Sequence, residues 1–192
     1  FENGFADDPK GVAESVRLAC GTGIAGLSIE DFSGRADEPL YPLDLSVERM
    51  RAARAAIDAS GCDVLLTGRS EGFIRNRPDM AATIARLKAF ASAGADCLYA
   101  PGLTTREQIA TVVEAVAPKP VNVLIGSPVA LTVSDVEALG GRRISVGGAM
   151  ARVAWGAVER MAREILEKGS FSGFATGKPA GELNGLFRGR SG

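Results

Sequence analysis

The sequence predicts an α/β protein built around a parallel sheet. Short apolar runs alternate with amphipathic segments along the whole of the first 168 residues, which is typical of successive βα units. The alternation has a period of roughly 25 to 35 residues, too irregular for a solenoid but usual for a barrel or an open α/β sheet. Nearly half of the 192 residues are apolar, enough to form one substantial core.

The first half of the chain contains three of these units. Phe1-Glu2 is expected to be the end of a strand, and Asp8-Pro9 supplies the cap and first-turn residue of the helix that follows. Gly61 and Gly94 are expected to end the next two helices. The predicted segments are a helix over 10–20, a strand over 26–31 with a helix over 46–60, and a strand over 63–69 with a helix over 78–93.

Three further units are predicted in the second half. Thr105 and Gln108 have the spacing of a capping box, so a helix is expected to begin there. The predicted segments are a strand over 96–100 with a helix over 105–116, a strand over 120–125 with a short helix from Ser134, and a strand over 143–147 with a long helix over 151–168.

A complete (β/α)8 barrel has eight units and takes about 250 residues, whereas the 192 residues of this chain contain six units. We therefore predict a (β/α)8 TIM barrel in which the first two βα units and the start of the third strand lie before Phe1. The structural alternative is a six-stranded open sheet, which would normally start with a whole strand. Residues 1–168 are assigned to the barrel. Residues 169–192, with three phenylalanines, are assigned to an extension that packs on the barrel or on a neighbouring subunit.

Composition excludes several classes of function. Twenty-two basic and twenty-three acidic residues leave the chain almost neutral, without the basic stripe of a nucleic-acid-binding protein. Neither a membrane span nor a signal peptide is visible. The odd number of cysteines, with no close pairing, fits a reducing compartment, and a cytoplasmic location is expected. Cys20, Cys62 and Cys97 are expected to be free thiols. Because the chain has no histidine, any metal that it holds should be a hard cation bound through oxygen, with Mg²⁺ the usual choice.

Polar side chains stand at the carboxyl ends of four predicted strands: Glu2, Glu30 with Asp31, Arg69 with Glu71, and Asn122. In parallel α/β proteins these ends open into the ligand site. Carboxylates there suit a divalent cation, often held through water, while an arginine can grip a substrate carboxylate with two hydrogen bonds. A metal-chelated 2-oxo acid uses both features.

Each of these residues also has a simpler interpretation. Glu30-Asp31 could cap or solvate a loop, and Arg69 could be an ion-pair partner of Glu71. Asn122 is more informative, because an amide inside a buried strand needs hydrogen-bond partners, and Ser145 makes the same point more weakly. Gly147-Gly148 could cradle a phosphate or allow close packing of strand and helix.

Six motifs, in order along nearly the whole chain, resemble the isocitrate lyase and phosphoenolpyruvate mutase superfamily. They are FENGF at residue 1, LSIED at residue 27, LTGRSE at residue 66, AGAD at residue 93, PVNV at residue 120 and RISVGG at residue 143. The resemblance implies a (β/α)8 barrel that binds Mg²⁺ and a small 2-oxo acid, and that makes or breaks a C–C or P–C bond next to the carbonyl through an enolate.

The resemblance also implies roles for individual residues. Glu2 and Glu30 match metal-binding acids, and a further acid is expected just before Phe1. Arg69 matches the arginine that binds the substrate carboxylate. Asn122 and Ser145 match polar lining, and Glu71 is placed with them in the substrate site. Arg69 and Glu30 are the expected catalytic residues.

One departure narrows the implied activity. Isocitrate and methylisocitrate lyases carry a cysteine and a histidine in the loop after the Glu-Asp strand, whereas residues 32–41 here have neither. The expectation is therefore an Mg²⁺-dependent lyase, mutase or hydrolase of the phosphoenolpyruvate mutase branch, in which this loop acts as a gate. The family also implies a homo-dimer or homo-tetramer that exchanges its last barrel helix. The alternatives are a non-catalytic barrel of the same family, which binds a metabolite or serves as an assembly subunit, and an unrelated barrel with phosphate near Gly147-Gly148.

Overall fold

The computed structural model describes residues 1–188, and it divides into two compact units between Gly147 and Gly148. The first unit carries the sheet and the helices packed on it. The second begins with the long helix that the sequence assigned to the barrel region 1–168. The assignment of that helix to the barrel, and of residues 169–192 to an extension, stays a prediction.

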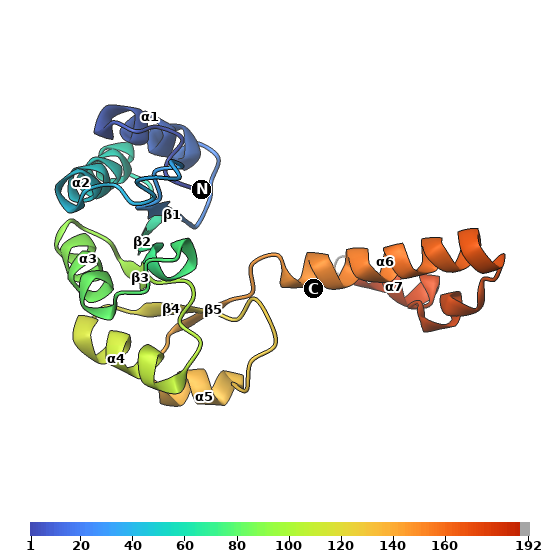
Figure 1. Cartoon of the computed structure of the whole chain (residues 1–192). Coiled ribbons are helices and arrows are strands. Elements are labelled where there is room, and N and C mark those ends of the chain that lie inside the picture. Colours follow the sequence, from blue (N-terminus) through green and yellow to red (C-terminus); the bar gives the residue numbers. More distant parts are fainter. Residues whose placement is uncertain (189–192) are drawn as a thin grey trace. The chain divides into compact units, whose positions relative to one another are not determined.

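The first unit is a five-stranded parallel sheet in the order β1-β2-β3-β4-β5 (Figure 1). This confirms the α/β class and the parallel sheet. The strands are β1 (Gly26–Glu30), β2 (Leu65–Arg69), β3 (Cys97–Tyr99), β4 (Val121–Leu124) and β5 (Arg143–Ser145). The helices that belong to them are α1 (Pro9–Cys20), α2 (Leu43–Ser60), α3 (Met80–Ser92), α4 (Arg106–Val116) and α5 (Val133–Ala138), and a 3-10 turn, η1 (Gly72–Arg75), follows β2.

The two faces of the sheet differ in chemistry because side chains alternate along each strand. One face packs on the helices (Figure 1) and supplies buried apolar residues to the core, among them Ile29, Leu66, Leu98 and Val123. The intervening positions carry polar residues such as Glu30, Arg69 and Asn122. The face away from the helices is therefore the one that can form a site.

Local sequence signals account for the helix ends. Asp8 caps α1 by accepting hydrogen bonds from the backbone of Lys10 and Gly11, and Thr105 with Gln108 forms the predicted capping box of α4. Gly61 ends α2 in the left-handed conformation, with φ of 67°. Helix α2 begins earlier than predicted, since its N-cap is Pro42 rather than a residue next to Ser46.

The segment before α1 does not form the predicted strand end, because Phe1 and Glu2 lie outside any strand. The Glu2 carbonyl nevertheless accepts a hydrogen bond from the Glu30 amide at 3.3 Å, which places this segment beside β1. Buried Arg49 of α2 holds the residues that follow. Its guanidinium donates to the carbonyls of Asn3, Ala6 and Asp7.

The second unit contains α6 (Ala149–Lys168), a 3-10 turn η2 (Ser172–Thr176) and a further helix, α7 (Ala180–Phe187), which the sequence did not predict. Gly169 ends α6 with φ of 61°, and Glu164 accepts hydrogen bonds from Ser170 and Ser172. These contacts fold the chain back after α6. Large apolar side chains remain exposed on this unit, including Trp155, Leu166 and Phe187.

Candidate active site

The site is organised by one row of residues that runs across the sheet. The strand register pairs Glu30 with Arg69, Arg69 with Tyr99, Tyr99 with Asn122, and Asn122 with Arg143. Neighbouring strands lie about 4.8 Å apart, so side chains on this row face the same side and contact their neighbours. The sequence predicted three of the five, and the structure brings them into a single row.

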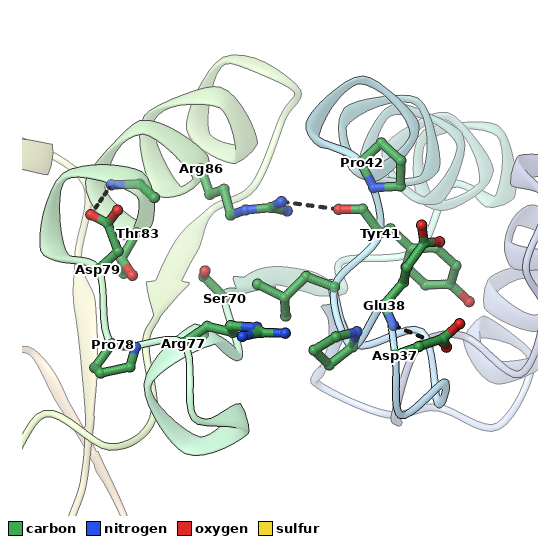
Figure 2. A pocket seen from close by; sticks show the side chains of 14 residues that line it. Asp37, Glu38, Tyr41, Pro42, Ser70, Arg77, Pro78, Asp79, Thr83 and Arg86 are labelled. Carbon is green, nitrogen blue, oxygen red and sulfur yellow. Dashed lines mark hydrogen bonds between the residues drawn. The ribbon is translucent and has the colours of Figure 1, made fainter.

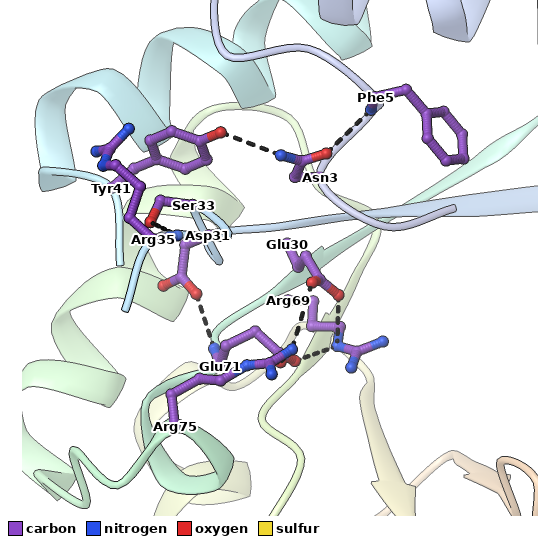
Figure 3. A network of polar contacts seen from close by, with 10 residues as sticks. All are labelled: Asn3, Phe5, Glu30, Asp31, Ser33, Arg35, Tyr41, Arg69, Glu71 and Arg75. Atoms are coloured by element: carbon purple, nitrogen blue, oxygen red, sulfur yellow. Dashed lines mark hydrogen bonds and ion pairs between the residues drawn. The ribbon is translucent and has the colours of Figure 1, made fainter. Parts of the chain in front are cut away.

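At the β1 and β2 end of this row, two glutamates and two arginines form a cluster, here called the charge cluster: Glu30, Glu71, Arg69 and Arg75 (Figure 3). Both carboxylates are buried. The Nε atom of Arg69 is 3.3 Å from Glu30 Oε2 and also donates to Glu71 Oε1. Arg75 Nη2 lies 3.0 Å from Glu71 Oε2 and 3.9 Å from Glu30 Oε1.

The Arg69 side chain is held in position through its Nε atom. Within residues 1–188, neither Nη1 nor Nη2 of Arg69 donates a hydrogen bond, whereas Nε is held by the glutamates. Its guanidinium also lies 5.0 Å from the centre of the Tyr99 ring. A guanidinium fixed in this way keeps its terminal nitrogens available for a carboxylate.

Glu30 has the most unusual electrostatics in the cluster. Burial, followed by the neighbouring charge of Glu71, raises the pKa of Glu30 to about 7, and Glu2 acts in the same direction. Arg69 and Arg75 oppose this rise. Within the described residues, neither carboxylate oxygen of Glu30 has a hydrogen-bond partner. This carboxylate is therefore available to a ligand.

Asp31, next to Glu30, has a structural role. Its side chain accepts hydrogen bonds from the Glu71 amide at 2.7 Å, from Ser70 Oγ at 3.2 Å and from Arg86 Nη1 at 3.2 Å. It therefore ties the end of β1 to the turn that carries Glu71. Asp31 points into these contacts and away from Glu30 (Figure 3).

The far end of the row is a smaller polar group. Buried Asn122 donates to Ser145 Oγ at 2.9 Å and accepts from Arg143 Nη1 at 3.3 Å. The amide that the sequence placed inside a strand thus finds the partners that its burial requires. The structure brings Asn122 and Ser145 together, as it does Glu30, Arg69 and Glu71.

Glu30 and Glu2 are the residues of the site that could hold Mg²⁺. Glu30 offers two buried carboxylate oxygens without hydrogen bonds, and the charge of Glu2 helps to raise the pKa of Glu30. Among residues 1–188, however, no group of three or more acidic, cysteine or histidine side chains is arranged to hold a metal ion. This set fits a magnesium ion that keeps several water ligands and uses one or two carboxylates, as Mg²⁺ commonly does.

A separate cavity of about 660 Å³ lies beside the site, between residues 37–42 and the start of α3 (Figure 2). Arg86, Arg77 and Ser70 contribute to its wall, and Arg86 donates to the Tyr41 carbonyl across it. It contains none of the charge cluster. The volume of this cavity is therefore not evidence that it is the active site. The polar groups that converge on the sheet indicate the position of the active site more strongly.

Fold and site together define an α/β protein whose polar site lies at the carboxyl edge of a parallel sheet. The family model for phosphoenolpyruvate phosphomutase matches residues 1–166. The chain therefore belongs to this family, within the phosphoenolpyruvate mutase and isocitrate lyase superfamily, which confirms the resemblance found in the sequence.

Individual relatives agree with this assignment. A solved structure of a predicted lyase/mutase from Burkholderia cenocepacia J2315 is 46% identical, with a TM-score of 0.93, over 98% of this chain and 68% of that one. An oxaloacetate decarboxylase from Paraburkholderia xenovorans is 35% identical over 66% of this chain and 42% of its own length. A structure of oxaloacetate acetylhydrolase with its product oxalate is 26% identical, with a TM-score of 0.80, over 94% of this chain and 61% of that one.

The chain spans about half the length of the curated relatives that it matches. An uncharacterised protein of Mycobacterium tuberculosis is 30% identical over 77% of this chain but only 52% of its own length. Within the described residues, every helix is too short or too polar to span a bilayer.

Sequence reasoning missed three members of the site: Arg75, Tyr99 and Arg143. Tyr99 could have been found, since it ends a strand as Arg69 does. Arg75 lies four residues after Glu71, a spacing that becomes informative only once the turn η1 is known. Arg143 stands at the start of β5, where the same rule gives no signal.

Proposed function

We propose that the chain carries the substrate-binding half of an enzyme that acts on a small 2-oxo acid, through an enolate, at a C–C or P–C bond next to the carbonyl. The observation that carries this proposal is the state of Arg69. Its Nε is fixed by Glu30 and Glu71, while its terminal nitrogens make no hydrogen bond to residues 1–188. A guanidinium presented in this way suits the carboxylate of a 2-oxo acid.

The other residues have supporting roles in the proposal. Asn122 and Ser145 would line the site beside the substrate, and Glu71 would keep Arg69 in place. Glu30 and Glu2 would hold Mg²⁺, in part through water. A bound Mg²⁺ supplies positive charge near the oxygen where negative charge develops. Glu30 would stay ionised beside the cation, because an adjacent positive charge favours the carboxylate form.

Oxaloacetate is the first substrate to test. Relatives named oxaloacetate decarboxylase and oxaloacetate acetylhydrolase support this choice. The whole protein, tested against oxaloacetate and phosphonopyruvate, should consume at least one of them with Mg²⁺ and neither with excess chelator. A chain that binds pyruvate or oxalate but turns over no 2-oxo acid would favour the non-catalytic alternative. A protein that neither binds these acids nor turns over any 2-oxo acid would contradict both the enzymatic proposal and the non-catalytic alternative.

Three wider features belong to the same proposal. The sheet would be part of an eight-stranded barrel whose first two units precede Phe1. The protein would form a homo-dimer or homo-tetramer through exchange of its last barrel helix, which would cover exposed side chains such as Trp155. It would work in the cytoplasm. Sedimentation of the whole protein tests the assembly, and a monomer would contradict it.

A further inference from the structure

A second pocket lies on the outer side of Arg75, between the loop that follows β1 and the turn η1. It has a volume of about 440 Å³. Phe32, Arg35 and Pro39 line it from the loop, and Arg75, Asn76 and Arg77 line it from the turn. Three of its lining residues are arginines, and among the described residues none of those lining it is acidic. We call it the arginine pocket.

The positive charge of this pocket is only partly balanced. The Arg77 side chain makes no hydrogen bond or ion pair with any residue in 1–188. Arg35 has one long ion pair, 3.7 Å to Glu38, with both side chains exposed, and such pairs contribute little. Arg75 is the exception, because buried Glu71 pairs with it at 3.0 Å. Gathering like charges around a cavity is unfavourable unless an anion offsets them.

Both walls of the pocket are held by hydrogen bonds rather than left as loose chain. On the loop side, the Ser33 amide donates to the Pro39 carbonyl at 2.9 Å, and Phe32 pairs with Leu40 in an antiparallel bridge. On the other side, the Arg77 amide donates to the Gly72 carbonyl at 2.9 Å.

One side chain joins the two walls. Arg75 lies across the ring of Phe32, with its guanidinium carbon 3.4 Å from the ring centre. Arg75 is thus fixed from both sides, by Phe32 on the loop and by Glu71 in the charge cluster. A preorganised guanidinium loses less entropy when it binds an anion.

We propose that the arginine pocket binds a small anionic group, a phosphate or a carboxylate, held by Arg35, Arg75 and Arg77. The group could belong to a free anion or to the far end of a substrate bound at the charge cluster, because Arg75 faces both. This inference goes beyond the proposed function. It requires binding alone, so it can hold or fail whether or not the protein turns over a 2-oxo acid.

The test measures binding of inorganic phosphate to the whole protein by calorimetry. The double variant R35Q/R77Q removes two exposed charges from the pocket and touches none of the proposed catalytic residues. It should weaken phosphate binding by about tenfold or more, since hydrogen bonds to charged groups are lost. The matched control R17Q/R51Q removes two exposed arginines elsewhere and should leave affinity within about twofold. No binding by the unaltered protein, or equal loss in both variants, would overturn the proposal.

A competition experiment identifies the source of the anionic group. Oxalate serves as the probe of the charge cluster. Simultaneous binding of phosphate and oxalate indicates a free anion in the arginine pocket. Mutual exclusion that R35Q/R77Q relieves indicates the far end of a substrate. Mutual exclusion that persists unchanged in that variant would place phosphate at the charge cluster and overturn the inference. Phosphate binding that is retained in the R69A variant would show that the arginine pocket binds its anion independently of Arg69, the residue on which the proposed function rests.

Discussion

The Nε atom of Arg69 lies 3.3 Å from Oε2 of Glu30, at the carboxyl ends of two adjacent strands that the register aligns residue for residue. The ion pair is mostly shielded from water, since the Glu30 side chain is 1% exposed and that of Arg69 is 24% exposed. Glu71 binds the same nitrogen from the following turn. Arg69 is therefore oriented by two carboxylates, and its terminal nitrogens can serve a ligand.

Replacing Arg69 with lysine should weaken binding of oxalate or pyruvate by about tenfold or more. Lysine keeps the charge, but it cannot pair through an inner nitrogen and present two terminal ones to a carboxylate. Calorimetry on the whole protein measures the affinity. Arg51→Lys is the control, because Arg51 is exposed on α2. Equal affinity of the R69K variant and the unaltered protein would remove the role assigned to Arg69.

The raised pKa of Glu30 predicts a pH dependence of stability. The carboxyl group ionises near its ordinary pKa of 4.5 in the unfolded chain and at about 7 in the folded protein. Between these values the folded state binds more protons, so the free energy of unfolding should fall as pH rises from about 4.5 to 7 and change little from this source above that.

The Glu30→Gln variant provides the test of this pH dependence. Glutamine is always neutral, so its contribution is independent of pH. Urea denaturation at pH 5 and pH 8, without divalent cations, should show a larger loss of stability for the unaltered protein than for the variant. The difference should be on the order of 2 kcal/mol, since one pKa unit corresponds to about 1.4 kcal/mol. The same loss in both proteins would contradict the assigned shift.

Much of the first unit could be predicted from periodicity, since its five complete strands and the helices between them form where apolar runs and caps indicated. The strand end expected at Phe1-Glu2 is not formed, because this segment makes only one backbone hydrogen bond to β1, from the Glu30 amide to the Glu2 carbonyl. Helix α7 was missed because its sequence is rich in glycine, which disfavours helix.

The site was predictable where one rule applied and not elsewhere. Polar residues expected at strand ends identified Glu30 and Arg69, which are the last residues of β1 and β2, because parallel strands end at the same edge of the sheet. Asn122 is the second residue of β4 rather than its last, and the polarity of its amide within a buried strand was the signal that identified it. Arg75 contributes from a turn whose shape depends on backbone hydrogen bonds to Glu71 and Gly72. The periodicity of strands does not predict a contact made from a turn, so the pairing of Arg75 with Glu71 became visible only in the structure.

Asp31 should prove essential for stability, although it stood first as a site candidate beside Glu30. Asp31→Ala would leave Arg86 and the Glu71 amide without their buried acceptor, and loss of one partner of a buried pair costs about 3 kcal/mol or more. Urea denaturation measures the change. Asp58→Asn, which removes an exposed carboxylate paired with the partly buried Arg54, should cost less than about 1 kcal/mol. Similar losses for the two variants would contradict this role.

Arg49 should hold the segment that carries Glu2 beside β1. Its buried guanidinium donates to the carbonyls of Asn3, Ala6 and Asp7, so Arg49→Met should lower the free energy of unfolding by about 2 kcal/mol or more. Hydrogen exchange should accelerate most over residues 3–7. Arg51→Met, on the exposed side of the same helix, should change neither quantity appreciably. If exchange in 3–7 were as slow in R49M as in R51M, another contact would have to fix this segment, and Glu2 would not depend on Arg49 for its position beside Glu30.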